Sequence, residues 1–408
     1  MAAPCSRHAR DDLELLGGDG AAGRVAAALA GTAAVARCRL HETHLRPGVG
    51  ATAGYVVTWS ARGREWDDYV LATTCPVAEG AVAERVRLGD REVRAWRHPA
   101  DPALPGLVRA CDVGVAGRMA AVAEPGLELV TYRPLRRAVV RVTGRPAGGK
   151  VSVAGRSTTY LKVVRPEIAA GVLARHALLA SGGVPVAPAR LLPDGVLALA
   201  ELPGVRLTDA LVGQGTRALP PAAVLDVLDA LPRSLLDLPP RGIAVEDTTV
   251  HAVAAAAMLP EHAPRLVRLA HDVTALVAGT DPGPVVPVHG DLHDANLLVD
   301  GGRVVGVLDV DAAGPGHRVD DLARLLAHLS VLANLDPVAH RWAPEVVRRW
   351  ARAFAEVVDA AALAARAAAV ALSLVAGAPG RGPGGGATAR IDVVDAWRRC
   401  ALARLGRS

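Results

Sequence analysis

The pattern of apolar and polar positions divides the chain into a β-rich first half and a mainly helical second half. Residues 53–60 and 68–74 are rich in β-branched and aromatic residues and follow a short helical opening. Two further apolar runs flank a turn at Leu135–Arg137, and Ser157–Val164 forms a third run. Such runs, separated by glycine and charged residues, predict antiparallel β-strands joined by tight turns.

Helical periodicity takes over after these strands. A helix is predicted over 168–180, and a hairpin turning at Asp194–Gly195 follows it. A compact β segment at 284–311, with its turn at Asp300–Gly302, interrupts the later helical region. The helices predicted there cover residues 221–236, 262–278, 319–334, 344–376 and 388–405.

This order of elements predicts an α+β fold in three parts. A small antiparallel sheet followed by a helical lobe that contains one β-hairpin is a two-lobed, protein-kinase-like layout. We expect an N-terminal cap region at 1–125, a kinase N-lobe at 126–203 and a helical C-lobe at 204–408.

The composition describes a globular protein with a core of small aliphatic residues. Hydrophobic residues make up 51% of the 408 positions, whereas aromatic residues make up 3%, so alanine, valine and leucine must fill the core. The net charge of +5 is spread along the chain without a basic block interleaved with aromatics, which disfavours nucleic-acid binding. Of the 46 basic residues, only Lys150 and Lys162 are lysines, so a lysine in a strand is a candidate for function.

The cysteines and the N-terminus suggest a compartment. Five cysteines lie far apart with no C-x-x-C pair, as expected of reduced thiols. The first residues carry acidic side chains where a signal peptide needs an apolar run, and the most apolar stretch, 367–376, is about half the length of a membrane span. We therefore expect a cytoplasmic protein that does not enter a membrane.

The segment from Val286 carries the chemistry. Asp291 and Asn296 have the D-x-x-x-x-N spacing of a kinase catalytic loop, and Asp309 follows thirteen residues after Asn296. A carboxylate such as Asp291 can orient an acceptor hydroxyl and take its proton. Magnesium prefers hard oxygen ligands, which the amide of Asn296 and the carboxylate of Asp309 supply. Asp311 is a possible additional ligand, although a role in stabilising the loop is an equal alternative.

These residues resemble a known motif series. His289–Gly290–Asp291, Asn296, Leu308–Asp309 and Asp321–Leu322–Ala323 are similar to the motifs of the aminoglycoside/choline phosphotransferase family, over residues 127–330. The resemblance implies a protein-kinase-like fold and phosphorylation of hydroxyl groups on small molecules with ATP and Mg²⁺. It also implies that Asp291 is the catalytic base and that Asn296 and Asp309 hold magnesium. The segments 98–107 and 132–142 more specifically resemble maltokinase-like bacterial members that have an extra N-terminal cap.

The first half offers residues for the nucleotide. Lys162 lies in the middle of a predicted strand, where a kinase lysine contacts the α- and β-phosphates; an exposed strand lysine is the alternative. The segment beginning Glu201–Leu202 resembles the family's interlobe hinge, whose backbone groups meet the adenine. Arg136, in the first hairpin turn, is a candidate phosphate contact, with a solvated turn as the alternative.

Two features depart from the family pattern. The helix after Lys162 lacks the glutamate that pairs with this lysine, and Glu167, just before it, is the nearest candidate. The first hairpin has no glycine-rich phosphate loop. A catalytically silent nucleotide-binding protein is therefore an alternative to an active kinase.

Three other motifs are weaker. Gly144–Lys150 matches most of a P-loop, but Val151 replaces its Ser/Thr and a strand follows it. Gly18–Gly23 fits a dinucleotide-binding fingerprint, with only Leu13–Leu16 available as its strand. His289, His293 and His317 suggest zinc but lack the H-E-x-x-H glutamate, which favours structural roles.

The sequence therefore predicts an ATP- and Mg²⁺-dependent kinase of a small-molecule hydroxyl, with a maltokinase-like sugar kinase as the narrower alternative. From Glu345 onward, the sequence contains ten arginines and five carboxylates. Because a polycationic acceptor needs carboxylates, this balance favours a sugar or polyol over an aminoglycoside. Outward-facing arginines with no bearing on the acceptor are the alternative.

Overall fold

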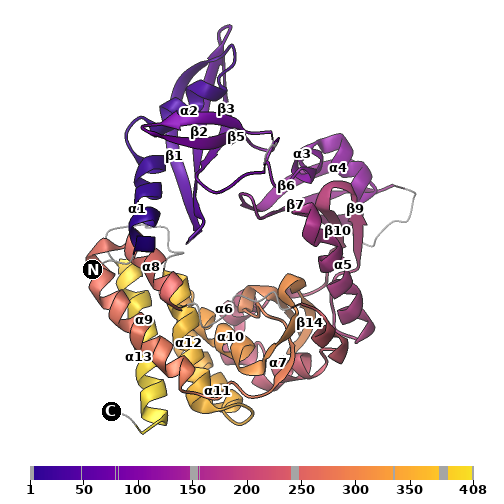
Figure 1. Ribbon diagram of the computed structural model, residues 1–408. Helices are drawn as coiled ribbons and strands as arrows, with labels where there is room; N and C mark the ends of the chain where they lie inside the picture. The colour runs from indigo at the N-terminus through magenta and orange to yellow at the C-terminus, as the bar shows by residue number, and fades with distance from the viewer. Residues whose placement is uncertain are drawn as a thin grey trace. The chain divides into compact units, whose positions relative to one another are not determined.

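The computed structural model describes residues 4–46, 48–78, 80, 82–147, 155, 157–239, 248–333, 336–375 and 385–406. Internal contacts divide the chain into two units (Figure 1). Unit 1 comprises Met1–Leu173 and Ala189–Glu201, and unit 2 comprises Ala174–Pro188 and Leu202–Ser408. No helix in the described ranges is long and apolar enough to cross a bilayer.

Unit 1 begins with a five-stranded antiparallel sheet in the order β1-β2-β3-β5-β4. Its elements are α1 (Pro4–Gly17), α2 (Ala21–Leu29), β1 (Ala34–Arg46), β2 (Gly50–Ala61), β3 (Arg64–Thr73), β4 (Glu84–Leu88) and β5 (Arg91–Arg97). The core beneath it combines Leu16 and Val25 from the two helices with Tyr55, Val57 and Trp59 from β2. The predicted strands at 53–60 and 68–74 are confirmed in β2 and β3.

A second five-stranded sheet, in the order β6-β7-β8-β10-β9, completes unit 1. Its elements are α3 (Gly106–Cys111), α4 (Val113–Ala120), β6 (Val122–Arg133), β7 (Arg137–Pro146), β8 (Ser157–Val164), the first half of α5 (Pro166–Ser181), β9 (Ala189–Leu192) and β10 (Val196–Ala200). The second half of α5, from Ala174, belongs to unit 2. The predicted boundary between cap and N-lobe, at residue 125, falls inside β6, so the three-part division stays a prediction. The Asp194–Gly195 hairpin is confirmed, with a 3-10 turn at Pro193–Gly195 between its strands.

The two faces of this second sheet pack differently. Leu161 and Val163 of β8 lie in a core with Leu107 and Ala116 of α3 and α4. Val164 and Leu197 instead belong to a smaller core with Ala169 and Val172 of α5. Because strand side chains alternate, Lys162 lies on the second of these faces.

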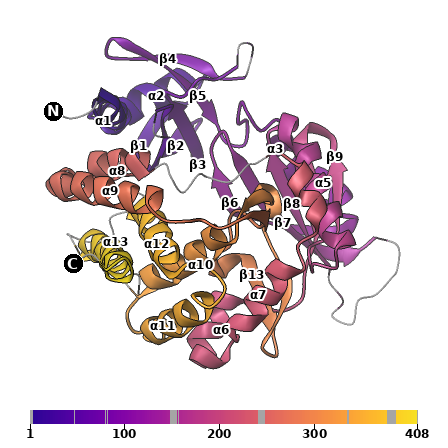
Figure 2. The same ribbon diagram turned by 60° about the horizontal axis from the view of Figure 1, so that its bottom comes forward.

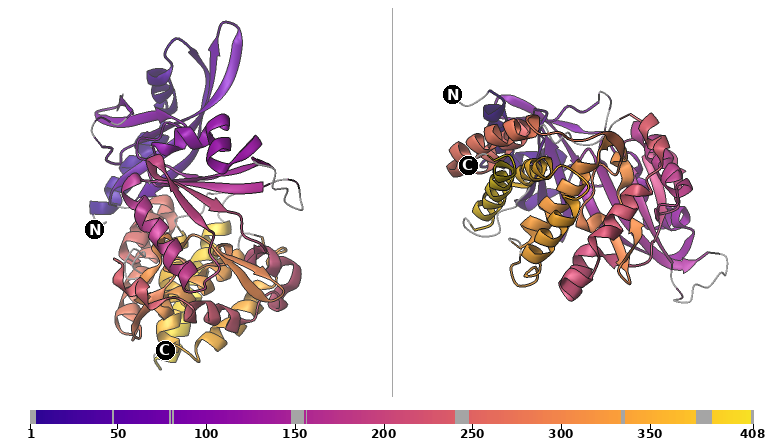
Figure 3. Two further views of the ribbon diagram at one scale, coloured as in Figure 1. Left: turned by 90° about the vertical axis from the view of Figure 1, so that its right-hand side faces the viewer. Right: turned by 90° about the horizontal axis from the view of Figure 1, so that it is seen from below.

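Unit 2 is mainly helical, and its helices pack side by side (Figures 1 and 2). Its helices are α6 (Leu207–Gln214), α7 (Pro221–Asp229), α8 (Thr248–Met258), α9 (Ala263–Ala278), α10 (Arg318–Leu332), α11 (Ala343–Phe354), α12 (Ala360–Val375) and α13 (Gly385–Arg404). α12 lies at the centre, where all twelve residues from Ala361 to Leu372 are buried. The C-terminal helices, orange to yellow, stay grouped in both views of Figure 3.

The strands of unit 2 are short and form two small sheets. They are β11 (Val205–Arg206), β12 (Val285–Val288), β13 (Leu297–Asp300), β14 (Arg303–Val307) and β15 (Gly314–His317), paired as β11-β13-β14 and β12-β15. The predicted hairpin with its turn near Asp300–Gly302 is confirmed as β13–β14. Single-turn 3-10 helices at Asp294–Asn296 and Val310–Ala312 flank this hairpin.

The helix predicted over 344–376 is in fact two helices. α11 ends at Phe354 and α12 starts at Ala360. The carboxylate of Asp359 accepts a hydrogen bond from the Ala362 amide at 2.7 Å, as an N-cap does. The break therefore comes from a capping residue, with no proline or glycine between the two helices.

Candidate active site

The His289–Gly290–Asp291 loop follows β12 and is held by one buried carboxylate. Asp321, in the first turn of α10 and 1% exposed, accepts backbone hydrogen bonds from His289 at 2.7 Å and Gly290 at 2.9 Å. Gly290 has a φ of 78°, and a Cβ there would lie 2.5 Å from the Ala312 carbonyl oxygen. Only glycine fits this position without strain. Burial raises the pKa of Asp321, while His289, the two amide hydrogen bonds and Arg324 oppose that shift.

A closed ring of hydrogen bonds includes the backbone of Asp291. Its amide donates to Nδ1 of His289 at 3.2 Å, and Nε2 of His289 lies 2.9 Å from the Leu308 carbonyl oxygen. The Leu308 amide donates to the Asn296 carbonyl at 2.8 Å, and Nδ2 of Asn296 donates to the Asp291 carbonyl at 3.0 Å. Since Nδ1 of His289 accepts, its Nε2 must carry the proton and donate. We refer to these four residues as the catalytic-loop ring.

The ring brings the predicted metal ligands to one place. Leu308 pairs with Asn296 at the open end of the β13–β14 hairpin, so Asp309 is one residue from that pair. The amide nitrogen of Asn296 is used within the ring, which leaves the amide oxygen as the atom that would bind a cation. Asp309 has a φ of 54°, in the left-handed region, where strain in a residue other than glycine often accompanies function. An amide oxygen and a carboxylate at one hairpin end fit magnesium.

Two side chains of α10, spaced one helical turn apart, face the catalytic loop. Nη1 of Arg324, a residue that is 8% exposed, lies 3.7 Å from Oδ1 of Asp291. The imidazole of His328 stacks on that of His293, with centroids 4.5 Å apart and an angle of 11° between the planes. Sequence reasoning missed both residues. Their spacing of four, after Asp321, is the signal that would have placed them on the loop-facing side of α10.

The histidines of the site have structural contacts. Nδ1 of His317 lies 2.9 Å from the Gly283 carbonyl oxygen, and His289 belongs to the ring. His293, Asp294 and His328 have possible metal-binding atoms within 4.8 Å of one another. An imidazole binds a metal in the plane of its ring, so two nearly parallel stacked rings cannot share one ion. Asp294 is also hydrogen bonded to the Thr208 hydroxyl.

Burial favours the neutral form of His293 and His328. Burial, followed by the charges of His293 and Arg324, lowers the pKa of His328 to about 3. Burial also lowers the pKa of His293, although Asp291, Asp294 and Asp309 act in the opposite direction. These interactions place three carboxylates close to the imidazole of His293, which makes this end of unit 2 locally acidic.

Unit 1 holds the residues predicted to bind phosphate and the first of the two predicted hinge residues. Lys162 pairs with Val139 and Leu197 in the sheet and is 4% exposed, so the alternative of an exposed strand lysine is wrong. A buried lysine is costly unless it has a partner, which favours a functional position. Glu167 instead forms an ion pair with Arg165 at 3.3 Å, and its side chain is 61% exposed.

Arg136 lies in a cluster of positive charge at the β6–β7 turn. Partial desolvation, followed by the charges of Arg133, Arg137, Arg46 and Arg165, lowers the pKa of Arg136. Like charges gathered in this way are unfavourable unless an anion joins them. We name these five residues the arginine cluster of unit 1.

The chain passes from unit 1 to unit 2 between Glu201 and Leu202, the two residues of the predicted hinge. Gly204, two residues later, has a φ of 94°, and a Cβ there would meet Val305 and Val299 of the β13–β14 hairpin. The first hinge residue therefore belongs to unit 1 and the second to unit 2.

The weaker motifs find no support. Gly144 lies within β7, and Gly148–Lys150 fall outside the described residues. Leu13–Leu16, the strand required before Gly18, is part of α1. The dinucleotide-binding alternative is therefore wrong.

Comparison with known proteins gives a family and several distant structures. Residues 152–369 match the phosphotransferase enzyme family (APH). A search of curated proteins finds no match. Aminoglycoside phosphotransferase APH(4)-Ia, crystallised with ADP and hygromycin B, is 14% identical, with 71% of this chain and 98% of that chain covered, at a TM-score of 0.49.

Two further structures are as distant. A choline/ethanolamine kinase family protein from Mesorhizobium loti is 16% identical, with 73% and 96% of the two chains covered and a TM-score of 0.46. Aminoglycoside phosphotransferase APH(3'')-Id from Streptomyces rimosus is 21% identical, with 64% and 96% covered and a TM-score of 0.39. Because all three TM-scores are below 0.5, the family assignment depends on the sequence match. That match spans more than half of the chain, so this protein, with its kinase-like α+β fold, belongs to the phosphotransferase enzyme family.

Proposed function

We propose that this protein is an ATP- and Mg²⁺-dependent phosphotransferase that phosphorylates a hydroxyl group of a small molecule. The observation that carries the proposal is the catalytic-loop ring. It fixes the backbone on both sides of Asp291 and holds Asn296 next to Leu308–Asp309. The choice of nucleotide agrees with the ADP that was crystallised with APH(4)-Ia.

Asp291 would orient the acceptor hydroxyl and take its proton. The bond from the acceptor oxygen to the terminal phosphorus forms, the bond from that phosphorus to the bridging oxygen breaks, and ADP leaves. The Asp291 side chain is 34% exposed, so it can reach an acceptor while its Oδ1 stays near the Arg324 guanidinium.

Asn296 and Asp309 would hold magnesium, which supplies positive charge to the phosphates when it is bound. Lys162 and Arg136 would contact the phosphates, and the backbone at Glu201–Leu202 would meet the adenine. These roles follow from the family motif and from the chemistry of each side chain.

For the acceptor we propose a neutral sugar or polyol, for a reason different from the arginine count. Five of the ten late arginines have partners within unit 2, three line a pocket described below, and Arg381 and Arg407 lie outside the described side chains. Arg324 is the more relevant residue, because this buried cation lies beside the proposed base. Arg324 would repel a cationic group of the acceptor that came directly beside Asp291, whereas a neutral hydroxyl carries no such charge.

The test is a transfer assay on the full chain. Purified protein, ATP and Mg²⁺ are incubated with maltose, glucose, glycerol, inositol, choline, ethanolamine and kanamycin. ADP release and the mass of the product are both measured, with Asp291→Asn protein as the control. We expect acceptor-dependent ADP release and a product heavier by one phosphoryl group with a sugar or polyol.

Other outcomes discriminate among the alternatives. Transfer to maltose alone would identify the maltokinase-like alternative. Binding of ATP–Mg²⁺ without transfer to any hydroxyl would identify a silent nucleotide-binding protein and overturn the proposal. Efficient transfer to kanamycin with inert sugars would contradict the proposed acceptor but not the reaction.

A further inference from the structure

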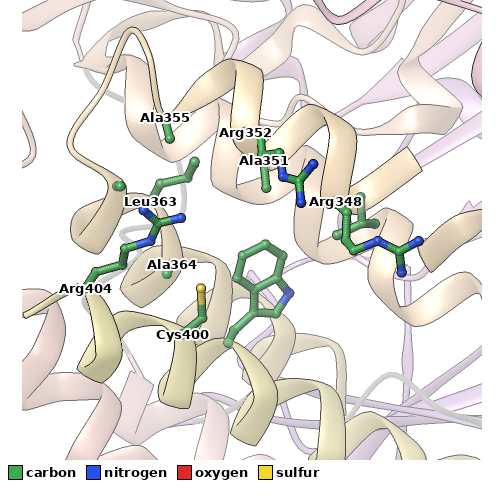
Figure 4. Close-up of a pocket in the computed structure, with 11 residues that line it drawn as sticks. Arg348, Ala351, Arg352, Ala355, Leu363, Ala364, Cys400 and Arg404 are labelled. Atoms are coloured by element: carbon green, nitrogen blue, oxygen red, sulfur yellow. The ribbon is translucent and has the colours of Figure 1, made fainter. Parts of the chain in front are cut away.

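Unit 2 contains a pocket of about 230 Å³ that is separate in sequence and in lining from the catalytic loop (Figure 4). It lies among α11, α12 and the C-terminal part of α13, and none of its lining residues belongs to the catalytic-loop ring. The residues that line it are Val347, Arg348, Ala351, Arg352, Ala355, Ala360, Leu363, Ala364, Trp397, Cys400 and Arg404.

The interior of the pocket is apolar and has a fixed aromatic surface. The small side chains of Ala351, Ala355 and Ala364 leave a space between the helices that larger side chains would fill. Trp397 is 9% exposed, and its Nε1 donates to the Ser330 hydroxyl at 3.1 Å. This hydrogen bond satisfies the one polar atom of the indole and holds the ring in place.

The rim carries three positive charges. Arg348 and Arg352 are spaced four apart on α11, and Arg404 comes from α13, with Cys400 one turn before it (Figure 4). All three arginines are exposed, and within the described ranges none of them has an ion-paired or hydrogen-bonded partner. Two like charges at i and i+4 destabilise a helix slightly, so this spacing has a cost without an anion.

Of the nearby carboxylates, Glu345 and Glu356 are exposed and form no ion pair with a rim arginine in the described residues, and three others have partners elsewhere. Asp395 pairs with Arg398 and Arg399, Asp392 pairs with Arg265, and Asp359 caps α12. No aspartate or glutamate lines the pocket. Among the described residues, no carboxylate therefore forms a direct ion pair with a rim arginine.

We propose that this pocket binds a small organic anion that has an apolar body and a phosphate or carboxylate head group. The apolar interior and Trp397 would cover the body, and two or three guanidinium groups would hold the head. Arginine forks match the geometry of both head groups. A volume of about 230 Å³ is smaller than the roughly 300–1,000 Å³ of sites for drug-sized ligands, so the ligand is small.

The concave shape and the positive charge of the pocket together distinguish it from a nucleic-acid-binding or membrane-binding surface. Nucleic acids and anionic membranes are bound by extended basic surfaces, whereas here three arginines surround one concave apolar site. A cation of the same size would find the apolar surface but meet three like charges.

Isothermal titration calorimetry on the full chain tests the proposal, with phenyl phosphate as the probe. Inorganic phosphate and 2-phenylethylamine are the comparators, since each lacks one half of the proposed ligand. We expect phenyl phosphate to bind more tightly than either. Arg352→Gln and Arg404→Gln should each raise its Kd by roughly 10- to 100-fold, the usual range for a charged hydrogen bond.

Arg399→Gln is the matched control, because Arg399 is an exposed arginine on α13 that pairs with Asp395 outside the pocket. It should leave the Kd within about twofold. Asp309→Ala should also leave it unchanged, which separates this site from phosphate binding at the candidate active site. Loss of phenyl phosphate binding in Asp309→Ala, with Arg352→Gln unaffected, would overturn the proposal.

Alkylation of Cys400 gives a second readout that does not depend on activity. Cys400 is partly exposed in the pocket, so phenyl phosphate should slow its reaction with iodoacetamide, as followed by peptide mass spectrometry. Cys38, also partly exposed but in unit 1, serves as the internal control. Equal rates at Cys400 with and without saturating phenyl phosphate would contradict the assignment, as would equally tight binding of 2-phenylethylamine.

Discussion

The two units concentrate opposite charges, and they do so in different ways. In unit 1, the charges of Arg46, Arg133, Arg137 and Arg165 act on Arg136 at a hairpin turn. In unit 2, carboxylates gather at the open end of a hairpin, next to a closed ring of hydrogen bonds. Like charges crowd Arg136 in the arginine cluster, whereas the four residues of the catalytic-loop ring are joined by hydrogen bonds. Positive charge suited to phosphate and oxygen atoms suited to a metal and a proton are thus provided by separate parts of the fold.

The largest expected effect tests the catalytic role assigned to unit 2. Asp291→Asn keeps the size of the side chain and the backbone ring but removes the proton acceptor. We expect kcat to fall by about two to four orders of magnitude, the range for a positioned base, with little change in ATP affinity. Steady-state kinetics and nucleotide titration measure the two quantities. Near-normal turnover in a folded variant would show that another group takes the proton.

The next effect concerns the metal ligands. Asp309→Ala should weaken ATP binding in the presence of Mg²⁺ by roughly 10- to 100-fold, because one charged ligand is lost. Calorimetry with and without Mg²⁺ measures this difference. Asp300→Ala, at the exposed turn of the same hairpin, is the matched control. Unchanged affinity in Asp309→Ala would mean that unit 2 does not bind the metal through this residue.

In unit 1, Lys162→Arg tests whether a buried ammonium is needed. The guanidinium is broader than the ammonium, and Lys162 is enclosed between β7 and β10 at 4% exposure. We expect the KM for ATP to rise roughly tenfold. A thermal unfolding scan separates this effect from loss of fold. Wild-type kinetics in a stable Lys162→Arg protein would leave the lysine with a structural role.

A smaller effect is expected at the exposed turn. Arg136→Gln should raise the KM for ATP by about two- to fivefold, since solvent screens an exposed charge. Arg145→Gln is the control, because Arg145 lies on β7 but pairs with Glu124. An equal response of the two variants would show that the arginine cluster has no specific role in phosphate binding.

The last prediction concerns the pH dependence of the folding stability and not activity. His328 has a pKa of about 3 in the fold against an ordinary value of 6.5, so between these pH values the unfolded chain binds the extra proton. Stability should therefore fall as the pH decreases from 6.5 towards 3, by up to about 1.4 kcal/mol per pH unit from this group. Chemical denaturation at several pH values measures the slope, and His328→Gln should reduce it. An unchanged slope would assign the pH dependence to other groups, among them the neighbouring His293.

The elements that sequence predicted best are those whose chemistry is local. The spacing of Asp291 and Asn296 and the position of Lys162 in a strand depend on short segments. Patterning also predicted β13–β14 and the helix after Lys162.

The elements that sequence missed depend on contacts across the fold. Arg324 and His328 lie in a helix whose loop-facing side is set by the contact of Asp321 with the catalytic loop, so their spacing of four identifies that side only when this contact is known. The short helices α3, α4, α6 and α8 were not predicted either, because each is 6 to 11 residues long and its stability comes mainly from tertiary packing. The pocket lined by Arg348, Arg352 and Arg404 needs three helices to form. A count of arginines could register their surplus but not their position.

Asp321 has one more consequence, which concerns entropy. Its carboxylate fixes the peptide groups of His289 and Gly290 from within the folded unit, so the loop is ordered before any substrate arrives. The cost of that ordering is met during folding and is not taken from the binding free energy of the acceptor. A phosphotransferase whose loop is ordered in this way does not need many acceptor contacts to order it.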